Sequence, residues 1–458
     1  MLRYVLTLFL LFPVALTAGE IPQSRAQMQL SFVPLVKAAT PAVVNIYAQI
    51  IAKPRSTPLQ RDPFFERFFR DPDHERPRVQ NSLGSGVILS RDGIVVSNYH
   101  VVGTATDIRV VLSDRREVSA RVLLADAASD LAILQLDGAG DLPFLTLRPS
   151  DSVEVGELTL AIGNPFGVGQ TVSSGIISGL ARSGTSSGGG LGYLIQTDAP
   201  INPGNSGGAL IDMQGRLIGV NTSILTRSGG SNGIGFAIPA DLIGAFVAEA
   251  RRGATRFARP WAGLSGQPVD ADLGVSLGLA RPEGIVVSGI HRVSPFQNTD
   301  VQVGDVITKV NGQPVNTPSE MVYRMSVIGL GAQAQVERLR NGVAGQVQVD
   351  LIDPPENPPR SPLRLAPPHL LVGLEVIQIN PAVMTQYRLP FDAQGVMVSE
   401  TGAVGAQVGL RVGDRLLAIN GQQIQTPPDV VAAVSRPGRA MAITVLRGAQ
   451  RLSLRFRI

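Results

Sequence analysis

The pentapeptide Gly204-Asn205-Ser206-Gly207-Gly208 is the part of the sequence best suited to covalent chemistry. A nucleophilic serine needs an exposed Oγ on a tight turn, with backbone N–H groups aimed at the oxyanion that develops during attack. Gly204 allows backbone conformations closed to other residues, so its N–H and that of Ser206 can converge. The alternative is a plain glycine-rich turn with a solvated serine, and the pentapeptide alone does not decide between the two.

A serine nucleophile also needs a general base, and His100 is the best candidate among the four histidines. It follows the apolar run Ile94–Val96, which predicts a position at the end of a strand. His74 lies in a charged segment, whereas His291 and His369 lie in a repeated C-terminal region. A structural histidine with no catalytic role is the alternative for His100.

The imidazole in turn needs a carboxylate that fixes its tautomer and stabilises the imidazolium. Asp130 directly precedes the apolar run Leu131–Leu134 and is predicted to lie at a strand entrance; Asp126 is the competitor. For either residue the alternative is a turn or cap carboxylate. The chain order His100, Asp130, Ser206 is that of chymotrypsin-type barrels and differs from the order in α/β-hydrolases.

The elements that must position these residues are short strands. The chain has 458 residues, which favours two to four domains, and its 50 glycines and 33 prolines indicate many turns. Short apolar runs such as Gly86–Leu89 and Arg109–Leu112 recur from about Gln29 to Ala250 and predict an antiparallel barrel or sandwich. The spacing in Asp241–Ala250 predicts a helix that closes this first domain.

Composition excludes several kinds of chemistry. The absence of cysteine rules out disulfides, iron–sulfur clusters, thiolate zinc sites and a cysteine nucleophile. The four scattered histidines contain no H-E-x-x-H motif, so we expect no metal ion and no cofactor. A net charge of only +4 without a lysine or arginine run disfavours nucleic-acid binding. No GxxxxGK[ST] motif is present, so ATP-driven unfolding within this chain is not expected.

The N-terminus predicts export. Arg3 precedes the apolar run Val5–Leu16, and small residues follow at Ala18 and Gly19, which is typical of a secretory signal peptide over residues 1–19. An uncleaved inner-membrane anchor is the less favoured alternative. No other apolar run reaches the ~18 residues that a membrane span requires, so we expect no integral membrane span in the mature chain.

The C-terminal half contains an internal repeat. Val303–Val315 matches Val412–Ile424, and Gly284–Val287 matches Gly395–Val398, at offsets of 109 and 111 residues. Two homologous modules of about 100 residues are therefore predicted. The proline-rich stretch 353–362 between them predicts a semi-rigid linker.

Five ordered signatures make the sequence resemble the HtrA/Deg (Do-like) family of periplasmic serine endoproteases. Ser97–Val102 resembles the family's T-N-x-H-V-V, and Asp126–Leu134 resembles its D-x-x-x-D-[IL]-A-[VI]-[LI], which assigns the catalytic aspartate to Asp130. The other matching stretches are Gln196–Leu210 around the serine, Ala161–Gly167 and Gly233–Pro239. The repeat resembles two PDZ domains.

The resemblance implies a mainly β protein in which a chymotrypsin-like double β-barrel is followed by two PDZ domains. The implied boundaries are a signal peptide at 1–19, a trypsin-like protease domain at 20–255 with a long loop at 52–80, a first PDZ domain at 256–352, a proline-rich linker at 353–367 and a second PDZ domain at 368–458. It also implies a periplasmic location and a homotrimer or larger oligomer.

The resemblance further implies ATP-independent cleavage of unfolded or damaged exported proteins, with a possible additional chaperone activity. The implied catalytic residues are His100, Asp130 and Ser206; the oxyanion would meet the amides of Gly204 and Ser206 with Asn205 nearby, and Ile224 and Leu225 would line the primary pocket. Substrate C-termini would bind the loops Trp261-Ala262-Gly263-Leu264 and Leu371-Val372-Gly373-Leu374. Residues 182–192 would form a sensor loop that relays PDZ occupancy.

Overall fold

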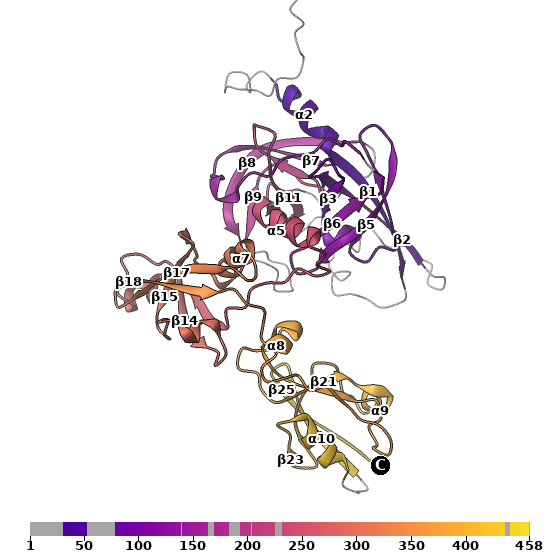
Figure 1. Cartoon of the computed structure of the whole chain (residues 1–458), viewed down its shortest axis with the longest axis vertical. Coiled ribbons are helices and arrows are strands. Elements are labelled where there is room, and N and C mark those ends of the chain that lie inside the picture. The colour runs from indigo at the N-terminus through magenta and orange to yellow at the C-terminus, as the bar shows by residue number, and fades with distance from the viewer. Residues whose placement is uncertain are drawn as a thin grey trace, which may run out of the picture. The chain divides into compact units, whose positions relative to one another are not determined.

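The computed structural model describes residues 31–52, 78–138, 140–163, 169–182, 193–202, 204–224, 231–435 and 440–457. The chain divides into two compact units, Met1–Phe257 and Ala258–Ile458 (Figure 1). The predicted signal peptide, most of the predicted loop 52–80 and nearly all of the predicted sensor loop lie outside the described residues. No helix within the described ranges is long and apolar enough to cross a membrane.

The first unit begins with a closed six-stranded barrel in the order β1-β2-β3-β6-β5-β4. Its strands are β1 (Val43–Ala52), β2 (Arg78–Ile88), β3 (Ile94–Ser97), β4 (Asp107–Val111), β5 (Glu117–Asp126) and β6 (Leu131–Leu136). The helices α2 (Val33–Ala39) and η1 (Thr40–Ala42) precede β1, and α4 (Tyr99–Val102) follows β3. Strand β3 is buried at all four positions, which agrees with the apolar run Ile94–Val96 that makes up most of it.

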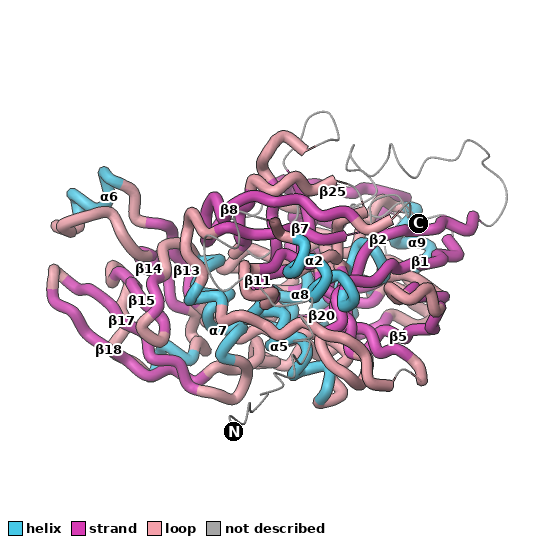
Figure 2. The backbone as a smooth tube through the Cα atoms, turned by 90° about the horizontal axis from the view of Figure 1, so that it is seen from above, coloured by secondary structure: helices cyan, strands magenta, loops and turns pink. Residues whose placement is uncertain are grey.

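A second closed barrel follows in the order β10-β11-β12-β9-β8-β7. Its strands are β7 (Leu158–Gly163), β8 (Thr171–Arg182), β9 (Leu194–Thr197), β10 (Ala209–Ile211), β11 (Leu217–Ile224) and β12 (Gly235–Pro239), and η3 (Ser150–Ser152) precedes β7. The two barrels confirm the predicted antiparallel architecture, and Figure 2 shows more strand than helix in the chain.

Helix α5 (Ala240–Arg251) closes the first unit, as its spacing predicted. It contacts β5 and β6 of the first barrel and β11 and β12 of the second. Phe246 is fully buried and stacks on Phe257 with ring centroids 3.9 Å apart. One amphipathic helix therefore ties the two barrels together through apolar burial.

The second unit holds the two predicted repeat modules. In the first module the strands follow the order β13-β14-β15-β17-β18, with β16 paired to β15. Its elements are β13 (Leu264–Pro268), α6 (Ala271–Ser276), β14 (Ile285–Ile290), η5 (Pro295–Asn298), β15 (Val306–Val310), β16 (Gln313–Pro314), α7 (Pro318–Ile328), β17 (Gln333–Arg340) and β18 (Val343–Asp350). Strand β13 lies at the edge of this sheet.

The second module repeats this order and adds one strand in front of it, giving β19-β20-β21-β22-β24-β25 with β23 paired to β22. Its elements are β19 (Leu363–Arg364), β20 (Glu375–Gln378), α8 (Pro381–Tyr387), β21 (Val396–Glu400), α9 (Gly402–Gln407), β22 (Arg415–Ile419), β23 (Gln422–Gln423), α10 (Pro427–Val434), β24 (Ala440–Arg447) and β25 (Gln450–Arg457). Strand β19 falls within residues 353–367, the predicted linker.

The repeated Gly-Asp pair has the same buried role in both modules. Asp305 and Asp414 are each 1% exposed. Arg340 donates to Asp305 at 2.6 and 2.8 Å, and Arg447 donates to Asp414 at 2.7 and 2.8 Å. Burial opposes ionisation of Asp305, but the hydrogen bonds from Arg340 and from the backbone outweigh it and hold its pKa below the usual range.

Candidate active site

His100 and Asp130 form a pair at one end of the first barrel. His100 Nδ1 lies 2.8 Å from Asp130 Oδ2 and 2.9 Å from Oδ1, and the backbone N–H of His100 donates to Oδ1 at 3.0 Å. The side chain of His100 is 13% exposed and that of Asp130 is 27% exposed. The carboxylate thus fixes both the imidazole ring and the backbone that carries it, as a general base requires.

The local chain path holds Asp130 in this position. The Asn98 side chain and the Tyr99 N–H donate to the Asp130 carbonyl at 2.9 and 3.1 Å. Asp130 adopts a positive φ of 53°, a left-handed conformation in which aspartate and asparagine are better tolerated than most residues. The competitor Asp126 is the last residue of β5, and its carboxylate accepts the Ser129 N–H at 2.7 Å.

Ser206 lies on the turn that leads into β10 of the second barrel. Ser85 of the first barrel holds this turn, since its N–H donates to the Ser206 carbonyl at 2.9 Å and its hydroxyl donates to the Gly204 carbonyl at 2.7 Å. Gly207 has a φ of +83°, and a Cβ there would lie 2.0 Å from the Ser85 carbonyl oxygen. A glycine is therefore required where the serine turn meets the first barrel.

Thr222 of β11 links the serine to the His100–Asp130 pair. The Ser206 hydroxyl donates to the Thr222 carbonyl at 3.1 Å. The Thr222 hydroxyl in turn donates to Asp130 Oδ2 at 2.6 Å. The structure therefore brings the three predicted residues together at the junction of the barrels, with the serine joined to the pair through Thr222.

The residues around the serine have separate roles in the turn. Gly204 has a φ of +95°, and within the described residues no acceptor is bonded to its N–H or to that of Ser206. Asn205 is 2% exposed, and its side-chain oxygen accepts from Thr171 at 3.2 Å. Asn205 therefore anchors the turn to the second barrel, while two amides near the serine are free to meet a substrate oxygen.

The predicted pocket residues are only partly described. Ile224 is the last residue of β11, but its side chain lies outside the described part of the structure, as does the whole of Leu225. Their predicted place in the primary pocket stays a prediction.

The two predicted carboxylate-binding loops precede corresponding strands, β13 and β20, but they are supported differently. In the first module Ser294 donates to the Ala262 carbonyl at 2.6 Å, next to Gly263 with its φ of +60°. In the second module Gly402 lies where Ser294 lies in the first, and a Cβ there would be 2.6 Å from the Val372 carbonyl oxygen. Leu371 and Leu374 are fully buried in the second loop.

Thr222 and Ser85 are the functional-site residues that the sequence patterns did not reveal. Both act through contacts with residues far away in the chain, 92 positions for Thr222 and Asp130 and 119 for Ser85 and Gly204. The two glycines that flank Ser85 were the one available signal, since they indicate a strand that another backbone approaches closely. Among the described residues, no group of three His, Asp or Glu side chains could hold a metal ion.

A model of the trypsin-like peptidase domain matches residues 84–220, which include His100, Asp130 and Ser206. PDZ domain models match residues 271–351 and 395–447, one in each repeat module. Two closed barrels with this cluster at their junction, followed along the chain by PDZ domains, define a trypsin-like serine endoprotease with two PDZ domains.

Curated relatives match almost the whole chain. The probable periplasmic serine endoprotease DegP-like of Pseudomonas fluorescens is 34% identical over 478 residues and covers 98% of each chain. The protein of the same description from Halomonas elongata is 35% identical over 463 residues, covering 96% of this chain and 95% of its own. The chain therefore belongs to the DegP-like family of HtrA-type serine endoproteases.

Solved structures agree with this assignment. The HtrA-type protease AlgW with a decapeptide is 39% identical with a TM-score of 0.52, and it covers 71% of this chain and 99% of that one. The same protease with a tripeptide is 37% identical with a TM-score of 0.54, covering 71% and 98%. The predicted family, enzyme class and mainly β fold with two PDZ domains are confirmed.

Proposed function

We propose that His100, Asp130 and Ser206 are the catalytic triad with which this endoprotease hydrolyses peptide bonds. The single observation that supports the roles best is the bidentate approach of Asp130 to Nδ1 of His100, because it leaves Nε2 to act as the base. In this structure the Ser206 hydroxyl donates to the Thr222 carbonyl. Rotation of the Ser206 side chain about its Cα–Cβ bond would redirect the hydroxyl to the imidazole of His100.

The reaction then follows the acyl-transfer pattern. His100 takes the proton of Ser206 Oγ as that oxygen bonds to the scissile carbonyl carbon, and the carbonyl oxygen becomes negatively charged. The amides of Gly204 and Ser206 would hold that oxyanion, a contribution worth ~10²–10³-fold per donor in comparable enzymes. His100 gives its proton to the leaving amine, and water later releases the acyl group from Ser206 by the same route.

The substrates we propose are unfolded or damaged exported proteins. The curated relatives are named periplasmic, and the N-terminal pattern of a signal peptide over 1–19 supports the same location for this chain. The absence of a nucleotide-binding loop in the sequence supports ATP-independent action. A homotrimer or larger oligomer, and the domain boundaries given above, remain part of the proposal.

The PDZ domains would bind substrate C-termini by adding them to a sheet edge. The first module supports this well, because β13 lies at the edge of its sheet and follows the loop Trp261–Leu264. AlgW has been solved with bound peptides, which shows that an HtrA-type relative binds short peptides.

A holdase activity is the second candidate, since PDZ modules that grip unfolded chains could suppress aggregation without cleavage. Suppression of client aggregation by the Ser206→Ala chain would support it. Equal aggregation with and without that chain would remove it.

The test of the proposed function is fragment mapping of casein by mass spectrometry with the wild-type and Ser206→Ala chains. We expect the wild type to cut after small aliphatic residues without ATP and the variant to yield no fragments. The Ser129→Ala chain is the matched control, because Ser129 lies beside the same site but outside the proposed triad, and it should still cut. Continued cleavage by purified Ser206→Ala would contradict the assignment of the nucleophile.

A further inference from the structure

The chain's own residues 360–365 cover one of the two edges at which a peptide could add. In the first module β13 pairs with β14 alone among the described strands, so its other edge is open. In the second module β20 pairs with β21 on one side and with β19 on the other. The two modules therefore differ at the strand that follows the carboxylate-binding loop.

The hydrogen bonds of residues 360–365 run along the full length of β20. The Gln378 N–H donates to the Arg360 carbonyl at 2.7 Å. Leu363 and Arg364 pair in antiparallel register with Val376 and Glu375. The later residues of the segment thus lie nearest the loop that precedes β20, which is the direction in which a C-terminal peptide would run.

The end of the segment also imitates a C-terminus. The Leu365 N–H donates to the Leu374 carbonyl at 2.9 Å, and the Leu365 carbonyl accepts from the Gly373 N–H at 2.9 Å. Gly373 belongs to the loop predicted to hold a substrate carboxylate. The Leu365 carbonyl therefore accepts a hydrogen bond from a loop amide that would otherwise bind the carboxylate of a substrate.

Side-chain burial alternates along the segment as it does in a bound strand. Leu365 is 2% exposed and belongs to the core of the second module, together with Val430 and Val434 of α10. Leu363 is partly buried against the same core, whereas Arg364 between them is exposed and pairs with Glu400 at 2.7 Å. The apolar side chains fill the module's groove and the charged one faces solvent.

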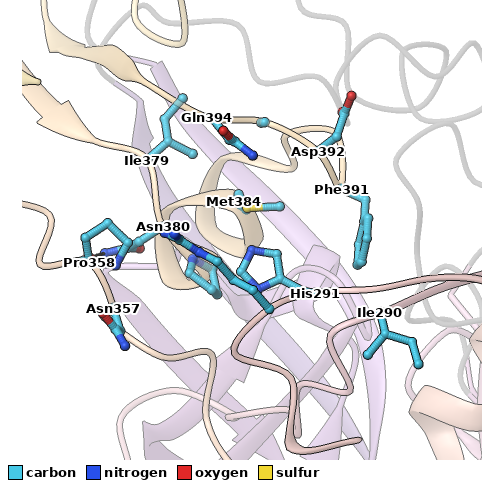
Figure 3. Close-up of a pocket in the computed structure, with 13 residues that line it drawn as sticks. Ile290, His291, Asn357, Pro358, Ile379, Asn380, Met384, Phe391, Asp392 and Gln394 are labelled. Carbon is cyan, nitrogen blue, oxygen red and sulfur yellow. Dashed lines mark hydrogen bonds between the residues drawn. The ribbon is translucent and has the colours of Figure 1, made fainter. Parts of the chain in front are cut away.

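The chain just before the segment is fixed to the same module. Asn380, which is 2% exposed, donates to the Pro358 carbonyl and to Glu356, each at 2.7 Å. Asn380 and Pro358 line a pocket of about 250 Å³, in which Figure 3 shows them side by side. Arg360 Nε donates to Glu356 at 2.9 Å, and this hydrogen bond lowers the pKa of the Glu356 carboxyl against the effect of burial.

We infer that residues 360–365 occupy the peptide-binding edge of the second PDZ module as an internal ligand, so that substrate C-termini bind the first module alone. The inference rests on the proposed peptide binding by PDZ domains. It means that the loop Leu371–Leu374, predicted above to hold a substrate carboxylate, instead holds the chain's own Leu365.

The test counts binding sites by isothermal titration calorimetry. The probe is a synthetic decapeptide of residues 356–365 with a free carboxylate, and the protein is the full Ser206→Ala chain, which should not cleave it. The release variant Leu363→Ser/Leu365→Ser removes the two buried side chains. The matched control Arg364→Ser removes only the exposed one.

We expect the release variant to bind one more decapeptide per chain than the parent and the control, a two-fold rise if the first module binds one. Amidation of the decapeptide should abolish the additional site. Failure of the first module to bind would lower every count by one and contradict the proposed function. Equal counts for the parent and the release variant would overturn the inference if the second module of the variant remains folded. Continued protection of the Ile379 amide from hydrogen exchange would show that it does.

A second pair of measurements decides the case in which the release variant unfolds the module. Arg364→Cys/Glu375→Cys places a disulfide between directly paired positions in a chain that has no other cysteine. We expect the oxidised and reduced forms to bind the same number of decapeptides. An additional site in the reduced form would show that free peptide displaces the segment and would overturn the inference.

Discussion

The two barrels of the protease unit hold their parts of the proposed triad in different ways. In the first barrel, His100 and Asp130 are fixed by each other and by Asn98, all from the same barrel. In the second barrel, the turn of Ser206 is held by Asn221 of its own barrel and by Ser85 of the other. The base is thus held mainly by its own barrel, with one hydrogen bond from Thr222 of the other, whereas the turn of the nucleophile is held by both barrels.

Because of this difference, substitutions at the two places should have different effects on catalysis and on stability. A change within the His100–Asp130 pair should lower the rate of the chemistry and leave the barrels joined. A change where the serine turn meets Ser85 should affect both the chemistry and the stability of the unit. The hydrogen bonds through Thr222 join the serine turn to the base, so a movement of this turn should be felt at Asp130 through Thr222.

Asp130→Asn gives the largest expected effect. The fold should remain, because asparagine tolerates the positive φ at this position, but the amide no longer selects the correct tautomer of His100. We expect kcat for casein-derived peptides to fall by ~10⁴-fold with little change in melting temperature. Asp126→Asn is the matched control and should keep nearly full activity; a reversed ranking would assign the carboxylate to Asp126.

Gly207→Ala tests the junction itself. The new Cβ would lie 2.0 Å from the Ser85 carbonyl oxygen and 2.6 Å from Ser97 Oγ, so the serine turn must move. A displacement of ~1 Å lowers kcat by ~10²-fold, and the melting temperature should fall as well. Gly156→Ala is the control, since it has a φ of +95° but open space around it. Equal losses in both variants would show that backbone strain, not the junction, is responsible.

Thr222→Val removes the hydroxyl that crosses from the second barrel to Asp130 while keeping the side-chain shape. Loss of one hydrogen bond to a carboxylate is worth ~1.5 kcal/mol, so we expect kcat to fall by ~10-fold with KM unchanged. Thr159→Val deletes a buried hydroxyl of the same barrel that donates to the Ile211 carbonyl at 2.7 Å. That control should lose stability but not kcat, and an equal loss of kcat in both would contradict a positioning role for Thr222.

As the pH falls, the second barrel should begin to lose stability at a higher pH than the first. Arg148, 7% exposed, donates to both oxygens of Glu157 at 2.5 and 2.9 Å, and this lowers the pKa of the Glu157 carboxyl against the effect of burial. Because the folded pKa lies below the ordinary value of 4.5, the contribution is complete above that pH. It is lost as the pH falls through the folded pKa.

The measurement is hydrogen exchange of β10 amides at pH 7 and at pH 3.5. Glu157→Gln should lower their protection by about 2 kcal/mol at pH 7 and by much less at pH 3.5. Glu117→Gln is the control, because Glu117 is 61% exposed in its pair with Arg109 of the first barrel and should change protection little. A pH-independent effect of Glu157→Gln would contradict the role given to its charge.

Much of the fold could be predicted because local patterns encode it. The buried run of β6 and the spacing of α5 are visible in single stretches of sequence. The matching Gly-Asp pairs predicted the two repeat modules. The pair recurs because Asp305 and Asp414 each make a buried hydrogen bond with an arginine. The candidate triad could be predicted because each residue type has a distinct chemical task at a strand end or turn.

The contacts between barrels and the state of the second module could not be predicted. The links of Ser85 to Gly204 and of Thr222 to Asp130 join positions whose own neighbours in sequence give no sign of a partner. The stretch around Leu363 was predicted as a linker because of its prolines, and proline content does not reveal that two alternating leucines fill a groove.

Labelling of the native chain with a fluorophosphonate tests most directly whether Ser206 is an activated nucleophile. The reagent bonds to a serine oxygen with loss of fluoride, and it needs a base that takes the serine proton. We predict that mass spectrometry finds the label on Ser206 of the wild type in the presence of casein, and on no serine of His100→Ala or of the urea-unfolded chain. Full casein cleavage with the label on another residue, or equal labelling of His100→Ala, would contradict the proposed triad.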